Sequence, residues 1–407
     1  MHAIRSALPN TFAFTVGKSL CTVPALLALF SVGCDGNMMT NTPPPAPTYL
    51  AVTASDFVAG TGTLSLIDPA TLQVRKAVDQ VDPSAVVRAF DKKLYIIDST
   101  HGSLRIYDAV DNFATPKDYP LRKTGVVDAT QGNPHDIFVD NATGKAYVSL
   151  YGSFGSTQVK ATTALAVLDL NNLAAGISSF VTLTVNPADT DGNPDASQLV
   201  GCGGSLYVLL QDLDRNAGYK PVGSGRLAKL NLASPQTASY IALAGENPTA
   251  MAVYGNCTEA IVGSAGDQLG GTLTGKSGIE RVDLSAAKTL GLQLTDSALG
   301  GNVSTLDASD GQHVFADLSV KSGTAYNNTV YAVDAVAKQK GAAVLGPMSY
   351  VPAVAVLGGQ LVVLSGGKAG SGQLKPGLYL GTATGTALPI EPFDFGLPPS
   401  SVALVSR

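Results

Sequence analysis

The densest group of oxygen-bearing side chains in the sequence is Asp189-Thr-Asp191-Gly-Asn193-Pro-Asp195. Asp and Asn at every second position can surround a hard cation, as in the first half of an EF-hand loop, so the segment suggests a Ca²⁺ site. The pattern is incomplete, because no Glu follows at the twelfth place and Gly192 stands fourth instead of sixth. The alternative is a solvated loop in which the same residues form turns.

Histidine is scarce, and His2 lies in the amino-terminal leader, which leaves His101, His135 and His313. His135 attracts attention because it follows Pro134 at the start of an apolar run. An imidazole there can contact a ligand only if the fold brings this end of the run to an accessible place. The alternative is a strand-end residue that is hydrogen-bonded to the backbone.

Two of the four cysteines, Cys202 and Cys257, each stand just before a β-rich run. In an exported protein such a pair is free to oxidise, so a Cys202–Cys257 disulfide is one prediction. Two buried free thiols are the alternative. A zinc site on this pair is not expected, because no CxxC motif and no nearby His completes it.

The segment 270–277 (GGTLTGKS) has the spacing of a phosphate-binding loop. That loop needs a strand before it and a helix after it. The residues that follow, IERVDL, read as a strand, so nucleotide binding is not expected.

All of these residues lie within a repeat of about 40–60 residues that is built from short β-rich runs. Six units end an apolar run on Asp or Asn, and a seventh copy lacks this residue. These ends are Asp68, Asp108, Asp169, Asn231, Asp283 and Asp334. An acid or amide at this place can bond the backbone two residues on and start a chain reversal. Such a repeat is typical of a β-propeller, and counting the second strands gives seven four-stranded blades.

The chain ends predict how the ring closes. Residues 399–405 (PSSVALV) look like a first strand with no second strand after it, whereas 49–52 look like a second strand with no first strand before it. Pairing of these segments would complete one blade from both termini and leave no open sheet edge. A two-domain β-sandwich is the alternative, but it would not predict split terminal strands.

Alignment of the units puts His135 in a mostly polar ring of residues at one mouth of the central channel. The ring members proposed to contact a ligand are Ser84, His135, Asp195 and Thr249.

The units follow the pattern Pro-x-x-apolar, then LYV or AYV, then apolar-x-apolar-apolar-Asp, from residue 49 to the carboxyl end. This resembles the YVTN type of bacterial seven-bladed propeller. The resemblance implies the fold, but it implies little about chemistry, because the fold hosts unrelated functions.

The amino terminus has the features of an export signal. Arg5 and Lys18 precede an apolar stretch at 20–33, which is shorter than the roughly 20 residues of a spanning helix. Small residues before Cys34 resemble a bacterial lipobox, in which the thiol receives diacylglycerol. We therefore expect a signal peptide at 1–33, lipidated Cys34 with a proline-rich tether at 34–48, and the propeller at 49–407. Plain secretion and an uncleaved anchor are the alternatives.

The net charge of −5 and the absence of a Lys/Arg cluster argue against a nucleic-acid partner. We expect a monomer in the bacterial cell envelope that is anchored by lipid and acts as a binding or scaffold module for a protein or glycan. Its long loops between second and third strands, at 151–163, 211–225, 263–278 and 318–329, would carry recognition. No cofactor is expected, apart from the Ca²⁺ considered above. The alternative function is a lactonase-like hydrolase or lyase that uses channel-mouth residues such as His135 and Asp195, with or without a divalent metal ion.

Overall fold

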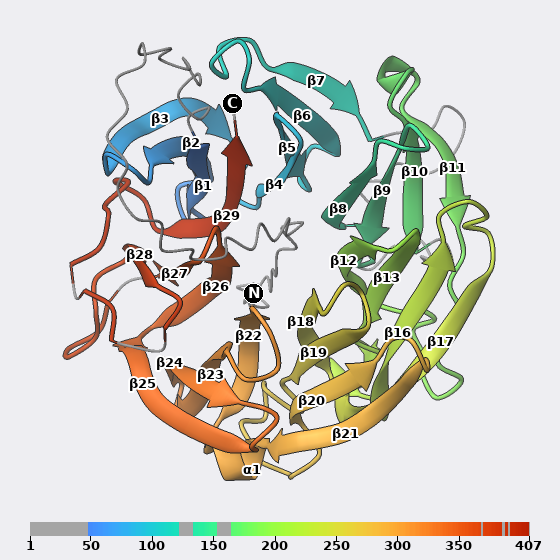
Figure 1. Ribbon diagram of the computed structural model, residues 1–407, viewed down its shortest axis with the longest axis vertical. Coiled ribbons are helices and arrows are strands. Elements are labelled where there is room, and N and C mark those ends of the chain that lie inside the picture. The colour runs from blue at the N-terminus through green and yellow to red at the C-terminus, as the bar shows by residue number, and fades with distance from the viewer. Residues whose placement is uncertain are drawn as a thin grey trace, which may run out of the picture.

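The computed structural model describes residues 48–121, 133–152, 164–367, 369–384, 387–389 and 391–406. The strands form a ring of seven antiparallel sheets, the blades, around a central axis (Figure 1). Within these residues the only helical segments are α1 (Asp296–Leu299) and the 3₁₀ turn η2 (Leu173–Ala175). The seven-bladed all-β propeller predicted from the repeat is confirmed. The predicted signal peptide, Cys34 and almost all of the tether lie outside the described residues.

Each blade runs from an inner strand at the axis to an outer strand at the rim. Blade 1 consists of β29 (Pro399–Ser406), β1 (Thr48–Asp56), β2 (Thr61–Asp68) and β3 (Gln73–Val81). Blade 2 consists of β4 (Val86–Phe90), β5 (Lys93–Asp98), β6 (Ser103–Asp108) and β7 (Lys117–Pro120). Blade 3 consists of β8 (Pro134–Asp140), β9 (Lys145–Leu150), β10 (Leu165–Asp169) and β11 (Ile177–Val181). Blade 4 consists of β12 (Ala196–Cys202), β13 (Ser205–Leu210), β16 (Ser224–Asn231) and β17 (Ala238–Glu246).

The last three blades continue the order. Blade 5 consists of β18 (Pro248–Tyr254), β19 (Glu259–Ser264), β20 (Gly278–Asp283) and β21 (Lys288–Thr295). Blade 6 consists of β22 (Asn302–Ala308), β23 (Val314–Ser322), β24 (Ala325–Asp334) and β25 (Gln339–Met348). Blade 7 has β26 (Tyr350–Leu357), β27 (Gln360–Gly366) and β28 (Gly377–Thr382), and its fourth strand is reduced to a bridge between Leu378 and Phe393.

The two chain ends close the ring in blade 1. The carboxyl-terminal strand β29 is the inner strand, and it pairs with β1 from Thr48 opposite Ser406 to Ala54 opposite Pro399. The inner strands β26 and β29 lie in contact across the seam between blades 7 and 1. The closure predicted from the split terminal strands is therefore confirmed.

Seven apolar clusters hold the described part of the chain together, one between each pair of adjacent blades. Successive side chains of a strand point to opposite faces of its sheet. In β1, for example, Leu50 and Val52 pack toward blade 7, whereas Ala51 packs toward blade 2. Because both faces of a blade are covered near its inner strands, second strands such as β13 and β27 are almost continuous buried runs.

The acid or amide that ends the third strand in six of the blades starts the reversal into the fourth strand, as the repeat predicts. The Asp68 carboxylate accepts from the backbone N–H of Ala70 at 2.8 Å, and Asn231 does the same for Ala233 at 2.9 Å. Asp283 differs slightly, because it bonds the N–H three residues on, at Ala286. These side chains satisfy backbone donors that the turn leaves without a strand partner.

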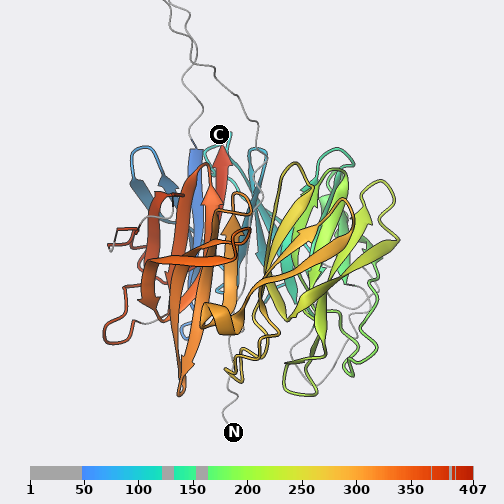
Figure 2. The ribbon, with the colours of Figure 1, turned by 60° about the horizontal axis from the view of Figure 1, so that its bottom comes forward.

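The ring has two unlike faces. We call the loop face the side with the links between blades and the turns between second and third strands. The terminus face is the opposite side, and it carries the start of β1 at Thr48 and the end of β29 at Ser406. In Figure 2 the label C marks the terminus face at the top, and the long turns of the green to orange blades project from the bottom.

The loop face is more ordered than the sequence suggests. Residues 211–225, expected to be a long loop, contain a small sheet of β14 (Leu213–Asp214) and β15 (Lys220–Pro221). Residues 318–329 were also expected to be a loop, and this prediction is wrong. These residues extend β23 and β24 into a hairpin with paired residues out to Ser322 and Ala325. Of the loop expected at 151–163, residues 153–163 lie outside the described residues.

Candidate functional site

The polar ring predicted at the channel mouth lies on the loop face, but its side chains are used within the protein. Asp195 and Thr249 are buried. The Thr249 hydroxyl donates to the carbonyl of Val303 in the next blade at 2.9 Å. The Ser84 hydroxyl donates to the Asp82 carboxylate. Ligand binding by the ring remains a prediction.

Deeper in the ring, buried polar side chains connect the inner strands of neighbouring blades. Asp136 lies 2.7 Å from Arg88 Nε and accepts from the backbone N–H of Leu199 at 2.9 Å, so it joins blades 2, 3 and 4. Gln198 bonds both backbone groups of Met251, at 2.7 and 2.9 Å, and so joins blades 4 and 5. A backbone donor at an inner edge would otherwise be buried without a partner, which costs about 1–3 kcal/mol.

His135 belongs to a group of contacts between blades 3 and 4. Its ring stacks on Tyr151 with centroids 5.1 Å apart. The guanidinium of Arg215 lies 5.5 Å from the centroid of the same Tyr151 ring and donates to Asp195 at 2.7 Å. The other Asp195 oxygen accepts from the N–H of Leu213 at 2.8 Å. His135 and Asp195, the channel-mouth residues of the alternative enzymatic function, are thus connected through Tyr151 and Arg215.

The ionisation of His135 follows from these surroundings. Burial, and then the positive charge of Arg88, lowers the pKa of His135 to about 4. The imidazole is therefore neutral near pH 7 and is a weak proton acceptor.

The residues of the predicted Ca²⁺ loop divide into two groups. Carboxylate oxygens of Asp189 and Asp191 lie within 4.8 Å of each other and of an oxygen of Asp214. Burial, with a smaller contribution from Asp191, raises the pKa of Asp189 to about 6. Both carboxylates also accept backbone bonds of the loop, including the N–H of Asn193.

Asn193 and Asp195, the other two predicted ligands, do not join that group of carboxylates. Asp195 pairs with Arg215. When the oxygen and nitrogen of the Asn193 amide are exchanged, the amide oxygen accepts a hydrogen bond from Arg215 at 3.0 Å. The Arg215 guanidinium therefore occupies the position beside Asn193 and Asp195 where the sequence predicted Ca²⁺. Asp214 joins the group of carboxylates instead, from β14, which lies about twenty residues later in the chain.

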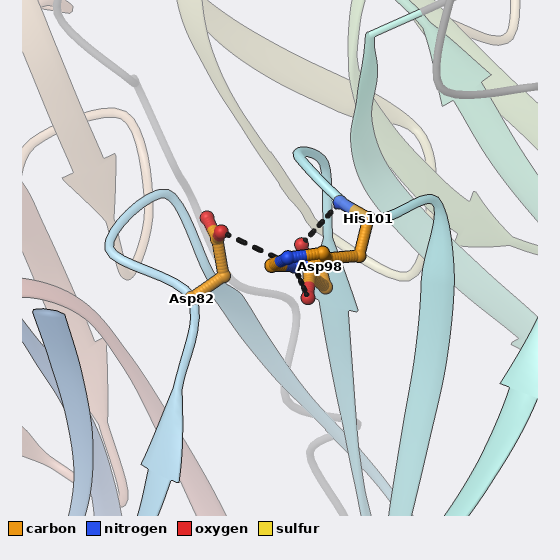
Figure 3. Close-up of side chains that lie close together, drawn as sticks. All are labelled: Asp82, Asp98 and His101. Carbon is orange, nitrogen blue, oxygen red and sulfur yellow. Dashed lines mark hydrogen bonds and ion pairs between the residues drawn. The ribbon is translucent and has the colours of Figure 1, made fainter. Parts of the chain in front are cut away.

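A second group of residues lies between blades 1 and 2, where a cavity of about 430 Å³ opens on the loop face. Asp82 belongs to the link between β3 and β4, and Asp98 and His101 belong to the turn between β5 and β6. Figure 3 shows that the Asp82 carboxylate is directed at the imidazole from the neighbouring element, while Asp98 lies next to His101 in the same turn. His101 Nδ1 lies 2.7 Å from Asp98 Oδ2 and 3.6 Å from Asp82 Oδ2.

Hydrogen bonds fix this arrangement. The backbone N–H of His101 donates to Asp98 Oδ1 at 2.8 Å, and the hydroxyls of Ser84 and Ser99 are 2.5 Å apart beside Asp82. The hydrogen bond that the imidazole donates to the Asp98 carboxylate raises the pKa of His101. Sequence reasoning placed Ser84 near a ligand but did not single out the residues around it. The available signal was the turn Asp98-x-x-His101, but its partner Asp82 lies in another element.

Among the described residues, the buried carboxyl of Asp317 has no cationic neighbour. Asp317 in β23 is fully buried and accepts from the Ser304 hydroxyl. Burial raises the pKa of Asp317 to about 7.

Because the folded pKa of Asp317 exceeds the usual value near 3.9, the folded state binds this proton more tightly than the unfolded state. The free energy of unfolding should therefore fall as the pH rises from about 4 to 7. Asp317→Asn removes the charge, so we expect it to be more stable than the wild type at pH 8, by at most about 4 kcal/mol. Urea unfolding between pH 4 and 8 measures the difference, and parallel curves for the two proteins would contradict it.

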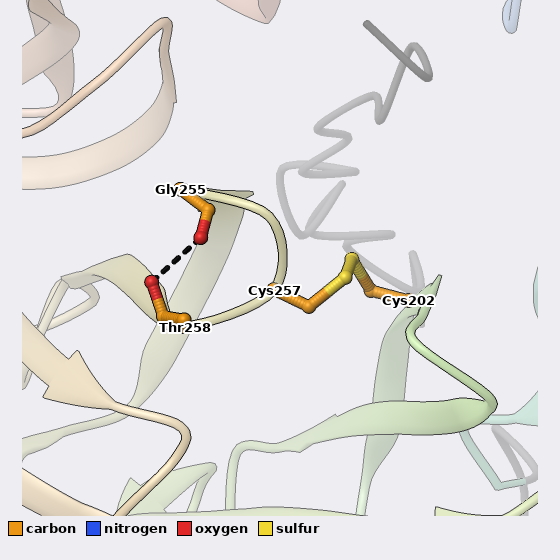
Figure 4. Close-up of a disulfide and its surroundings, with 4 residues drawn as sticks. All are labelled: Cys202, Gly255, Cys257 and Thr258. Atoms are coloured by element: carbon orange, nitrogen blue, oxygen red, sulfur yellow. Dashed lines mark hydrogen bonds between the residues drawn. A yellow bond between two sulfur atoms is a disulfide. The ribbon is translucent and has the colours of Figure 1, made fainter.

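On the terminus face, Cys202 and Cys257 are joined by a disulfide in the structure, with Cα atoms 5.6 Å apart (Figure 4). Each stands in a turn between a first and a second strand, and the turn of Cys257 is tightened by a bond from Thr258 to the Gly255 carbonyl at 2.6 Å. The bond thus links blades 4 and 5 at their inner ends.

Replacing both cysteines by serine should lower the free energy of unfolding by about 2–4 kcal/mol, because the cross-link restricts the unfolded chain. Urea unfolding of the wild type with and without a reducing agent is the internal control. Equal midpoints for oxidised wild type and variant would contradict the expectation.

Segment 270–277 has the spacing of a phosphate-binding loop, but in the structure its donors bind a carboxylate of the same chain. The backbone N–H groups of Thr274 and Gly275 donate to the Asp296 carboxylate at 3.0 and 2.7 Å, and the Ser277 hydroxyl donates at 2.8 Å. The donors that would hold a phosphate thus bind an internal carboxylate.

Within the described residues, no helix has the length and apolar character that crossing a membrane requires.

Comparisons with known proteins identify the fold. No protein-family profile matches the sequence, and no curated protein is similar to it. A crystal structure of a Lactobacillus plantarum protein is similar, with a TM-score of 0.59 at 11% identity over 89% of this chain and 100% of that one. A Bacteroides fragilis protein provisionally described as a 6-phosphogluconolactonase has a TM-score of 0.58 at 10% identity, over 91% of this chain and 100% of that one. At such identities these likenesses show the β-propeller architecture and nothing finer.

Proposed function

We propose that this chain is a lipid-anchored β-propeller of the bacterial cell envelope that binds a protein or glycan partner through its loop face. The observation that supports this most strongly is the position of Thr48, where β1 begins, on the terminus face. A lipid on Cys34 would then hold the terminus face toward the membrane and leave the loop face directed away from it.

The loop face also presents apolar side chains to solvent. Phe57 and Val58, at the tip of the turn between β1 and β2, are 57% and 99% exposed. Leu269 and Leu273 are exposed in the long turn of blade 5, and Val320 is exposed near the end of β23 in blade 6. Apolar side chains on turns of a rigid frame are suited to recognition of a partner.

The anchor is tested by fatty-acid labelling in cells. We expect labelled wild-type protein in the membrane fraction, and unlabelled protein for Cys34→Ser. Cys21→Ser, which changes a cysteine of the expected leader, is the matched control and should remain labelled. Labelling that survives Cys34→Ser would refute the anchor.

Binding is tested by photo-crosslinking in cells, with a photoreactive residue in place of Val58 on the loop face. The control position is Leu72, which is 52% exposed in the turn between β2 and β3 on the terminus face. We expect a defined crosslinked product from position 58 and not from position 72. The reverse pattern, or no product from either position, would contradict recognition through the loop face.

The alternative function, a lactonase-like hydrolase or lyase, would use His135 and Asp195. The contacts favour it less, because both Asp195 oxygens already accept hydrogen bonds and His135 is a weak base. Binding is therefore the function that we propose.

A further inference from the structure

We propose that Asp82, Asp98 and His101 form a binding site for a divalent transition-metal ion of the Zn²⁺ type, at the cavity between blades 1 and 2. This site lies apart from the predicted Ca²⁺ loop, and it does not depend on a lipid anchor.

The three ligand atoms are already close to the separations that a metal requires. The imidazole Nδ1 and one oxygen of each carboxylate lie within 4.8 Å of one another. Bonds of about 2.0–2.2 Å to a tetrahedral Zn²⁺ place ligand atoms roughly 3.3–3.5 Å apart. The Asp82 oxygen is 3.6 Å from Nδ1, and the Asp98 oxygen is 2.7 Å away and would move outward by less than about 1 Å.

The hydrogen bonding of Asp82 gives the second, independent observation. Its side chain is only 2% exposed. The Oδ1 atom accepts from the N–H and hydroxyl of Ser84, but among the described residues no donor forms a hydrogen bond with Oδ2. This oxygen is directed at His101. At the cavity wall a cation can therefore bind this oxygen without displacing a hydrogen-bond donor.

The electrostatic environment also favours a cation. Asp82, Asp98 and Asp118 line the cavity, whereas Arg105 is its one guanidinium. Arg105 is held by Asp118 at 2.7 Å and by Asp79 at 3.1 Å. Among the described residues no Lys or Arg pairs with Asp82 or Asp98, so only His101 faces these two carboxylates.

The surroundings resemble a metal site that is supported on the protein side and open toward the solvent. The backbone bond from His101 to Asp98 Oδ1 and the Ser84–Asp82 bonds fix the carboxylates, as outer partners of metal ligands do. The His101 side chain is 72% exposed at the cavity, so an ion can enter and keep water or an anionic ligand in its free positions. One imidazole with two carboxylates suits Zn²⁺ or Mn²⁺ better than Ca²⁺, which takes six to eight oxygens.

The chain contains a matched control for this arrangement. His313 and Asp310 form the same i, i+3 pair, with Nδ1 2.9 Å from the carboxylate and the His313 N–H bonded to it at 2.9 Å. Among the described residues no third ligand of the Asp82 kind accompanies this pair. If an exposed His-Asp pair were enough to bind metal, both places would do so.

The experiment titrates Zn²⁺ into the chelator-treated full chain in detergent, by calorimetry, with Co²⁺ absorption as a second readout of coordination. We expect one Zn²⁺ per chain. His101→Ala and Asp82→Asn should each weaken binding by more than about 100-fold, since even outer partners of metal ligands are worth about 10- to 100-fold. His313→Ala should bind like the wild type. Because His101 is exposed, His101→Ala should retain the wild-type thermal midpoint without metal.

Two results would overturn the proposal. One is wild-type protein that binds no Zn²⁺, or that binds it as tightly after His101→Ala. The other is binding that is lost on Asp189→Asn while His101→Ala retains it, which would assign the metal to the carboxylate group in blade 4. If Asp82→Asn does not fold, Asp98→Asn takes its place with the same expected loss.

Discussion

A chain that ends at Pro398 is expected to lose its folded structure, because it lacks the inner strand of blade 1. In the intact protein, Val402 and Val405 in β29 are at most 1% exposed, and β1 pairs with β29 along its length. Burial of a valine contributes about 1.5–3 kcal/mol. Two such losses, together with the broken pairing, approach the roughly 5–15 kcal/mol net stability of a typical domain. Circular dichroism during heating should show no cooperative transition.

A chain in which the residues of β29 are moved to the amino terminus shows whether the strand itself, and not its place at the carboxyl end, is needed for folding. Residues 399–406 are fused to the amino side of Thr48 through a two-residue Asn-Gly turn, which suits a tight antiparallel hairpin. The Ser406–Thr48 pairing should re-form with the same register, and cooperative unfolding should return. An unchanged melting midpoint in the shortened chain would show that β29 does not close the ring in solution.

Asp136→Ala should destabilise the protein by about 3–5 kcal/mol, because it leaves the buried Arg88 guanidinium without its neutralising carboxylate. Both side chains are at most 5% exposed, and they lie 2.7 Å apart. The N–H groups of Ile137 and Leu199 lose their acceptor in the same variant. Urea unfolding near pH 7 measures the change in free energy.

The double variant Arg88→Met, Asp136→Leu is the control for this pair. Apolar side chains of similar size can replace a buried ion pair at little cost, so the double variant should be more stable than Asp136→Ala alone. The double variant should still be less stable than the wild type, mainly because the N–H groups of Ile137 and Leu199 lose the Asp136 carboxylate as their acceptor. If Asp136→Ala lay within about 0.5 kcal/mol of the wild type, as surface changes do, the pair would not connect the blades as described.

The fold could be predicted because its determinants are local and repeated. Asp68 and the residues aligned with it each begin a turn by bonding nearby backbone, and this requires no knowledge of distant residues. The split strands at the two chain ends indicated the closure for the same reason. The hairpin at 318–329 was missed because its polar, exposed residues have the composition of a loop, and only their pairing reveals strands.

The candidate site could be predicted only in part, because its contacts join segments that are far apart along the chain. The position of Asp195 on the loop face followed from alignment, but its partner Arg215 lies in a turn that no repeat specifies. Asp82 and His101 come together only when the link from blade 1 packs beside a turn of blade 2. The Asp136–Arg88 pair was missed for a related reason, since polar residues within apolar runs give no sign of which residues they face.

The central position of β1 within its sheet has a mechanical consequence. Any tension that arrives through the residues before Thr48 acts along the axis of a strand that is flanked on both sides, by β29 and β2. Antiparallel hydrogen bonds lie perpendicular to the strands, so this pull shears all of them together and does not peel them off one by one. Because β29 is the carboxyl-terminal strand, the β1–β29 pairing that resists this force is also the pairing that closes the ring of blades.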